Sequence, residues 1–202
     1  MAVVDLAEPA EVEALTRGEA WRAHPVRELY ACAGFGLRGP VQSAPAHAHA
    51  RLFQVNVLAR LALAEAALPA MVREGFGRIV LVSSSSAFQP LPYMATYAAA
   101  NAALLSLGEA WASELDGTGV QLVTACPGGM QTNFQASAGV RQPAGERLMP
   151  PEDVADAILA ACRRGQTTVV ISFRAHAMAC LARVLPRRMS VALWKRLMAR
   201  LR

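Results

Sequence analysis

The sequence predicts an α/β protein of three layers, in which helices cover both faces of a mostly parallel sheet. Its 202 residues are 54% hydrophobic and only 17% charged, a composition that suits strands buried on both faces. Short β-like runs alternate with helical stretches, which is the order typical of a parallel sheet. The length suits one domain, or one domain with a short appendage.

The first half of the chain contains two predicted strands and two predicted helices. AVVDLA (2–7) is a short β-like run around Asp5, and Pro9 opens a helical stretch with acidic residues in its first turn. ELYACAG (28–34) is a buried-strand candidate closed by glycine. Apolar residues then recur at helical spacing over 50–73, and the glycines of GFG end that helix.

The second half repeats this alternation with clearer signals. RIVLVSS (78–84), VQLVTACPG (120–128) and TTVVIS (167–172) are predicted strands. An alanine-rich helix is predicted over 97–115. A second helix is predicted over 150–165, with acids first and arginines last, as the helix dipole favours.

Polar and glycine-rich pieces follow three of the predicted strands: AGFG, SSSS and PGGMQT. Ligands of parallel sheets bind at the carboxyl ends of the strands, so a site is expected at this edge. The run GFGLRG (34–39) matches G-x-G-x-x-G, but Pro40 follows it and no acid lies between Glu28 and Glu65. A dinucleotide fingerprint needs a helix there and an acid about 20 residues on, so a tight turn is predicted instead.

Composition also bears on location and metals. The N-terminus has neither a basic start nor a long apolar run, which argues against a signal peptide. No window reaches the roughly 18 uninterrupted apolar residues of a membrane span. The four histidines lack metal-ligand spacing, so no metal site is expected. Free thiols in a reducing cytoplasm are expected for the cysteines, which form no CxxC: Cys32, Cys126, Cys162 and Cys180.

The run from 78 to 132 resembles the short-chain dehydrogenase/reductase family. GRIVLVSSSSAF is similar to the strand that leads to that family's catalytic serine, and CPGGMQT to its Pro-Gly loop. YAAAN is similar to the Tyr-x-x-x-Lys helix start, with Asn101 in place of the lysine. The resemblance implies a dinucleotide-binding, Rossmann-like sheet.

Upstream segments extend the resemblance. ACAG (31–34) is similar to the family's Asn-Asn-Ala-Gly turn with both asparagines lost, and Asn56 matches an asparagine in the long helix that follows. DLAEPAEVEAL is similar to the third-strand segment, whose aspartate lies near adenine. The resemblance therefore covers a domain over 1–172 and leaves a separate tail over 173–202.

The family's chemistry implies roles for four residues. Tyr97 would exchange a proton with the substrate oxygen, and Ser84, thirteen residues earlier, would hydrogen-bond the same oxygen. Asn101 can donate a hydrogen bond but lacks the charge that favours tyrosinate. Asn56 either holds a helix kink or a proton-passing water, or is a plain polar residue of a helix interior.

The resemblance also implies NAD or NADP as cofactor and a small carbonyl or alcohol as substrate. Asp5 and Leu6 would face adenine, and Ala33 and Gly34 form the turn beside the cofactor. The nicotinamide side would be formed by the Pro-Gly loop, namely Pro127, Gly128, Met130 and Thr132.

The family's opening unit, a strand, the loop Thr-Gly-x-x-x-Gly-x-Gly, a helix and a strand, does not occur in the sequence. Weak cofactor binding is expected, because that loop holds the pyrophosphate. A strand at residues 2–6 would then either pair with 28–33 or leave the sheet edge open. Three interpretations stay open: a weak oxidoreductase, a pseudoenzyme that serves as a binding or dimerisation module, and a truncated product of an active dehydrogenase.

The tail carries a separate signal. Residues 157–202 contain ten basic residues and no acidic one. A basic amphipathic helix is predicted from 188 onward, either on a membrane surface or packed on the protein's own core. No nucleic-acid-binding module surrounds this charge. The family pairs the helices at 50–73 and 97–115 between subunits, so a homo-oligomer is expected. The apolar face of the tail helix is formed by Met189, Leu193, Leu197 and Leu201.

Overall fold

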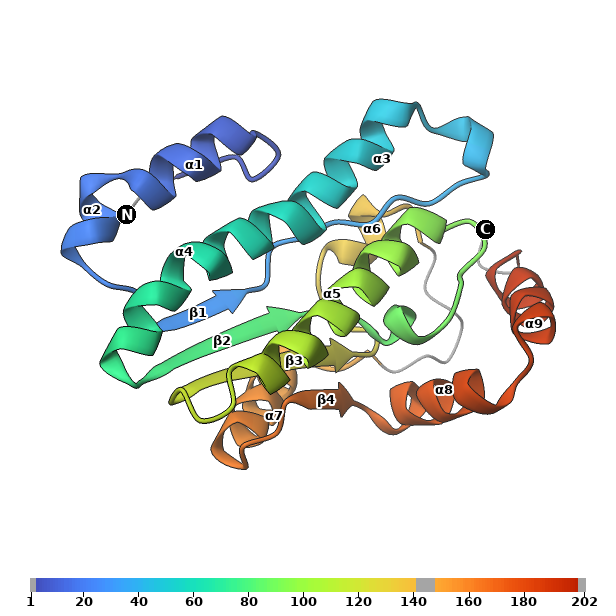
Figure 1. The fold of residues 1–202 in the computed structure, drawn as a ribbon. Helices are drawn as coiled ribbons and strands as arrows, with labels where there is room; N and C mark the ends of the chain where they lie inside the picture. The colour runs from blue at the N-terminus through green and yellow to red at the C-terminus, as the bar shows by residue number, and fades with distance from the viewer. Residues whose placement is uncertain (1–2, 141–147, 200–202) are drawn as a thin grey trace.

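The computed structural model describes residues 3–140 and 148–199, and its centre is a four-stranded parallel sheet. The strands lie side by side in chain order (Figure 1): β1 (Glu28–Ala31), β2 (Gly77–Val82), β3 (Val120–Pro127) and β4 (Thr168–Ile171). All three neighbouring pairs are parallel, so every connection crosses over the sheet. The predicted α/β class with a parallel sheet is confirmed.

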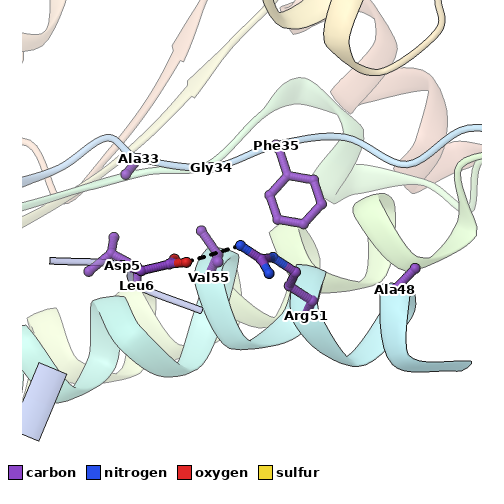
Figure 2. Close-up of a pocket in the computed structure, with 8 residues that line it drawn as sticks. All are labelled: Asp5, Leu6, Ala33, Gly34, Phe35, Ala48, Arg51 and Val55. Carbon is purple, nitrogen blue, oxygen red and sulfur yellow. Dashed lines mark hydrogen bonds and ion pairs between the residues drawn. The ribbon is translucent and has the colours of Figure 1, made fainter. Parts of the chain in front are cut away.

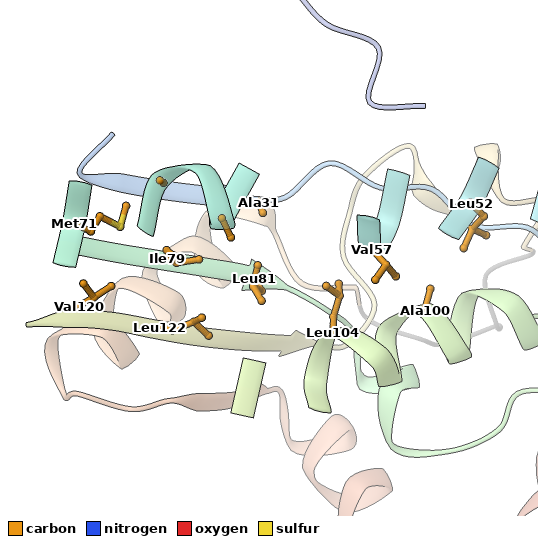
Figure 3. Close-up of a cluster of buried hydrophobic side chains, with 12 residues drawn as sticks. Ala31, Leu52, Val57, Met71, Ile79, Leu81, Ala100, Leu104, Val120 and Leu122 are labelled. Carbon is orange, nitrogen blue, oxygen red and sulfur yellow. The ribbon is translucent and has the colours of Figure 1, made fainter. Parts of the chain in front are cut away.

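Three helical segments cover one face of the sheet. They are α3 (Ala46–Phe53), α4 (Ala59–Glu74) and α5 (Ala95–Glu114) (Figure 1). Ile79 and Leu122 point from the strands into this layer, where Met71 and Leu104 meet them (Figure 3). All four side chains are almost completely buried, so this layer holds the main core.

The other face of the sheet is covered by α7 (Pro151–Arg163). Val80 and Val123 point to this side and pack with Val154 and Ile158 of the helix. Strands β2 and β3 are thus buried on both faces, which explains why their sequences are nearly continuous apolar runs. At the edge of the sheet, Tyr30 of β1 is 40% exposed.

The N-terminal segment does not form the predicted strand at 2–7. Residues 3–7 carry no strand and do not pair with β1. The side-chain carboxylate of Asp5 instead accepts a hydrogen bond from the Ala7 amide at 2.9 Å. The backbone carbonyl of Asp5 accepts one from the Glu8 amide at 3.0 Å. Aspartate closes such local turns readily, which competes with a strand. The helices α1 (Pro9–Arg17) and α2 (Glu19–Ala23) follow, and α1 packs on α4.

The helix predicted over 50–73 is longer than expected. α3 and α4 are joined by a π-helical turn over Gln54–Leu58, and Gly75 ends α4 in the left-handed conformation, at φ 64°. The combined run Ala46–Glu74 is long and apolar enough to cross a membrane by length and composition. Because it packs on the sheet and on α5, we treat it as a core helix.

Two helices form the C-terminal tail: α8 (Phe173–Val184), which the sequence did not predict, and α9 (Arg187–Ala199). Trp194 and Met198 of α9 pack on a cluster beside the start of α5. The helix therefore packs on the protein's own core, the second of the two alternatives. The predicted apolar face of α9 is less buried than Met198, since Met189 is 58% exposed. Leu201 of that face lies outside the described residues. Membrane-surface binding by this tail stays a prediction.

Three shorter helices complete the described chain: η1 (Val41–Ser43), η3 (Ser85–Phe88) and α6 (Phe134–Ser137).

Candidate active site

Ser84 and Tyr97 meet at the carboxyl end of β2. Ser84 lies two residues after the last residue of β2 and caps η3, where its hydroxyl accepts a hydrogen bond from the Ser86 amide at 3.1 Å. Tyr97 lies in the first turn of α5, and its ring packs against Phe134 with centroids 5.1 Å apart. The two side chains predicted to share a substrate oxygen are therefore brought together by a strand end and a helix start.

Burial raises the pKa of the Tyr97 phenol above its usual value. Hydrogen bonds with the side chains of Ser84 and Asn101 lower this pKa, and so does the positive charge of Arg60, but burial is the larger influence. Tyr97 is accordingly a neutral proton donor near pH 7, with three neighbours that favour its ionised form.

Asn101 turns back onto its own helix. Its side-chain nitrogen donates to the Tyr97 carbonyl at 2.8 Å, and the Ser83 hydroxyl donates to the Asn101 carbonyl at 3.0 Å. Asn101 is only 4% exposed. It thus ties β2 to α5 and brings no charge to the site.

Arg60 is a site residue that the sequence analysis missed. It lies on α4, is 4% exposed, and its guanidinium donates to the carbonyls of Ala33 at 2.8 Å and Val82 at 2.5 Å. Burial lowers the pKa of Arg60 to about 10, and the nearby Tyr97 and Cys32 act to raise it. The signal in the sequence is one arginine within the apolar run QVNVLARLALA.

Asn56 clamps the loop that follows β1. Its side chain accepts from the Phe35 amide at 3.1 Å and donates to the Phe35 carbonyl at 2.9 Å. It lies within the π-helical turn and is 3% exposed. The structure therefore places this asparagine at an irregular helix turn and gives it two backbone partners.

A cavity of about 430 Å³ opens at the carboxyl end of β1. It brings together all four residues predicted for the adenine side and the adjoining turn: Asp5, Leu6, Ala33 and Gly34. Figure 2 shows Arg51, which comes from α3, pointing to Asp5, with the charged groups 3.1 Å apart. A small cleft with one acid and one base suits part of a dinucleotide.

The loop GFGLRG (34–39) runs past this cavity in an extended form. No helix starts within it, and the next element is the short turn η1. No turn is found over residues 34–38, so the predicted tight turn is wrong. Asn56 and Arg60 hold the loop from beneath, which keeps it extended.

The four residues predicted for the nicotinamide side lie at the end of β3 and in the loop after it, and they do not line this cavity. The Gly128 amide donates to the Ile171 carbonyl at 3.1 Å, which anchors the loop to β4. Thr132 is exposed, and its hydroxyl accepts from the Phe134 amide at 3.3 Å. Met130 bridges to Met149, and Pro127 ends the strand. Among the described residues, no cluster of three His, Cys, Asp or Glu side chains could hold a metal ion.

Comparison with known families decides what this geometry belongs to. The model of the short chain dehydrogenase family matches residues 1–142. The chain belongs to the short-chain dehydrogenase family. The structural similarity supports this: a short chain dehydrogenase from Burkholderia cenocepacia in complex with NADP superposes with a TM-score of 0.77 at 27% identity, covering 100% of this chain and 80% of that one.

This chain spans only part of the length of the relatives that it matches. Ketoacyl reductase HetN from Nostoc is 28% identical over 169 residues, which span 83% of this chain and 59% of that protein. Probable oxidoreductase EphD from Mycobacterium tuberculosis is 31% identical over 76% of this chain but only 29% of its own length. A third relative, from Xanthobacter autotrophicus, is named inactive 2-(S)-hydroxypropyl-CoM dehydrogenase 2, with 28% identity over 77% of this chain and 73% of that protein.

Proposed function

We propose that this chain carries the proton-transfer half of an NAD(P)-dependent site that interconverts small carbonyls and alcohols, with weak activity in the 202-residue form. The observation that carries the proposal is the meeting of Ser84 and Tyr97 at the carboxyl end of β2. Two neighbours in the family, from Burkholderia cenocepacia and Sphingobium yanoikuyae, are complexes with NADP and NADPH. These support a nicotinamide dinucleotide as cofactor.

The residues have distinct tasks in this proposal. The Tyr97 phenol donates its proton to a carbonyl oxygen, or takes one from an alcohol, and the Ser84 hydroxyl hydrogen-bonds the same oxygen. The bound nicotinamide supplies or accepts the hydride. Asn101 and Ser83 fix the start of α5 against β2, which holds the phenol in place.

Cofactor binding is expected to be weak. The cavity beside Asp5 and Gly34 has about 430 Å³, room for one end of a dinucleotide, with Leu6 and Val55 as apolar walls. The described residues offer no glycine-rich loop that leads into a helix, which is the usual pyrophosphate site. The remaining polar contacts are the exposed ion pair of Asp5 and Arg51 and backbone groups.

A second candidate is a pseudoenzyme that serves as a binding or dimerisation module. Asn101 leaves its position without charge, and the relative from Xanthobacter carries the word inactive in its name. Leu58 is 52% exposed and Val72 is 44% exposed on the outer side of the long helix, a surface that suits a partner. A longer parent protein with full activity is the third candidate, since the chain matches relatives over part of their length.

The test is a cofactor titration joined to an assay. The purified chain is titrated calorimetrically with NADH and NADPH, and turnover is measured on a panel of small ketones and aldehydes. We expect binding weaker than low micromolar, and slow turnover that Tyr97→Phe abolishes. Turnover that does not require NADH or NADPH, or turnover that survives Tyr97→Phe, would reject the proposed site. Silence in both assays favours the pseudoenzyme.

The oligomeric state is part of the proposal. Leu58 at the end of η2 and Val72 on α4 are exposed apolar side chains, and they support a homodimer or a larger assembly, as the family resemblance implies. Sedimentation at micromolar concentration should show at least a dimer, and Leu58→Glu should weaken it, whereas Arg73→Glu near the end of the same helix serves as a surface control. A stable monomer contradicts the expectation.

A further inference from the structure

We propose that Arg60 supplies the positive charge for Tyr97 that the family's motif places at position 101. The inference rests on the proposed function, because it concerns how the same phenol is kept ready to exchange a proton. It assigns the charge to a different helix: position 101 lies on α5, with the phenol, whereas Arg60 reaches the site from α4. Arg60 acts through Tyr97 and is a positioning residue.

Position 101 cannot supply this charge itself. The Asn101 side chain is a neutral amide: its nitrogen donates to the Tyr97 carbonyl, its oxygen accepts from the Ser83 hydroxyl, and its hydrogen bond with the phenol brings no charge. The single lysine of the chain, Lys195, lies in α9. A cation for the phenol must therefore come from another element.

Arg60 is held at the correct edge of the sheet by backbone carbonyls. Its guanidinium donates to Cys32 at 3.4 Å and to Ala33 after β1, and to Val82 at the end of β2. Val82 is the last residue of β2 and stands two residues before Ser84, so the charge is fixed at the end of the strand that leads to Ser84. Gly34 leaves the space for it, since a Cβ there would collide with the guanidinium.

The charge on Arg60 has no carboxylate partner among the described ion pairs. The titratable groups that influence it are the Tyr97 phenol and the Cys32 thiol. On α3, the His49 ring nitrogen lies 2.6 Å from the hydroxyl of Thr96, the residue before Tyr97, and Arg51 pairs with Asp5. A buried and unpaired charge acts strongly on its neighbours, because little water screens it.

The electrostatics of the phenol agree with this arrangement. Burial raises the pKa of Tyr97, and the charge of Arg60 opposes that rise. The pKa of Arg60, lowered by burial to about 10, still leaves the guanidinium charged at neutral pH. Arg60 therefore favours tyrosinate at working pH, as a lysine does in the family's motif.

A purely structural role makes a different prediction. Arg60 could merely tie the loop after β1 to the end of β2. By the family resemblance, the turn after β1 is the one in which both asparagines are lost. Charge and hydrogen bonding are separated by two variants: Arg60→Lys keeps the charge but loses most of the bonds, and Arg60→Gln loses the charge and keeps some of them.

The experiment measures the ionisation of Tyr97 in the full chain without cofactor. 3-Fluorotyrosine is placed at position 97, and its fluorine resonance is followed against pH, alongside urea unfolding of each variant. We expect Arg60→Gln to raise the midpoint by about one pH unit or more, Arg60→Lys to leave it nearly unchanged, and the double variant Arg60→Gln/Asn101→Lys to bring it back. Arg73→Gln, an exposed change on the same helix, is the matched control.

An unchanged midpoint in Arg60→Gln overturns the proposal. If that variant does not fold, Arg60→Lys decides: lower stability with an unchanged midpoint supports a charge role, and a shift of both supports the structural role. The titration is independent of cofactor binding. A negative result here therefore leaves the proposed function standing, and a failed cofactor titration leaves this measurement intact.

Discussion

The two halves of the sheet's carboxyl edge differ in how they hold their side chains. In the half proposed to be catalytic, here called the catalytic half, Ser83 and Cys126 are buried where β2 and β3 end, and Asn101 is buried on α5 within reach of Ser83. In the half proposed to bind the cofactor, here called the nucleotide half, Gly34 lies on the loop after β1, and Asp5 pairs with Arg51 although their side chains are 48% and 56% exposed. One half is built from regular elements and the other from loops.

The difference shows which part of the family's chemistry this fold fixes most firmly. A proton donor must be held within a narrow range of positions, and packed strands and helices provide this. The proposed cofactor contacts depend on loops, which open more easily because they bury fewer apolar contacts. Catalytic side chains can thus persist in a chain whose cofactor contacts are few.

The largest expected effect is on stability. Leu104 is fully buried between α5 and the strands, so Leu104→Ala should lower the free energy of unfolding by about 2–5 kcal/mol. Val55 lines the cavity beside Asp5 and is half-buried, so Val55→Ala should cost only about 1 kcal/mol. Urea unfolding with an unchanged m-value measures both.

Two results would contradict this comparison of the two halves. An m-value that changes in either variant would mean that the denatured state, and not packing, has been altered. A Val55→Ala loss as large as that of Leu104→Ala would show that the nucleotide half is as tightly packed as the catalytic half, and the contrast between them would be wrong.

The second prediction uses one thiol from each half. Burial raises the pKa of Cys126, at the end of β3, to about 12. Cys32, after β1, is an exposed residue. Partial burial of its thiol group raises the pKa of that thiol, and the charge of Arg60 lowers it. Because the thiolate is the reactive form, a thiol reagent at pH 8 should modify Cys32 at least about a hundredfold faster than Cys126. Peptide mapping by mass spectrometry follows each site.

Cys180 is exposed on α8 and serves as the reference for an accessible thiol. Arg60→Gln should slow modification of Cys32, because the charge that favours its thiolate is lost. Rapid modification of Cys126 in the unsubstituted chain would mean that the catalytic half opens in solution.

Much of the fold follows from sequence patterns. Strands β2 and β3 are continuous apolar runs because both faces are buried, and α7 has acids first and arginines last. The strand predicted at 2–7 was wrong, because the Asp5 side chain closes a local turn that apolar patterning cannot reveal. The tail helix α8 has no clear apolar face, and Phe173 is 88% exposed, so periodicity could not predict it.

The candidate site was predictable in part. The spacing of Ser84 and Tyr97 identified the pair, because thirteen residues connect a strand end to the helix that returns beside it. Arg60 could not be found this way. Its position depends on how α4 crosses the ends of β1 and β2, which is a tertiary arrangement. A single arginine in an apolar helical run is the trace that such a buried charge leaves.

The smallest expected effect concerns the ion pair of the nucleotide half. Asp5 and Arg51 are 46 positions apart in the chain, yet their pairing is largely exposed to water. A double-mutant cycle with Asp5→Asn and Arg51→Gln should give a coupling of less than about 1 kcal/mol, which falls further as salt screens it. Asparagine is chosen because it can still accept the hydrogen bond from the Ala7 amide.

The pair formed by Glu13 and Arg17 within α1 is the matched control, since its side chains are 56% and 75% exposed. Exposed pairs one helical turn apart contribute about 0.3–0.5 kcal/mol, and the Asp5–Arg51 coupling should be of that order. A coupling above about 2 kcal/mol would show that Asp5 is locked against α3. The first segment would then be as fixed as the catalytic half, and a loosely held adenine side could no longer contribute to the weak cofactor binding that we propose.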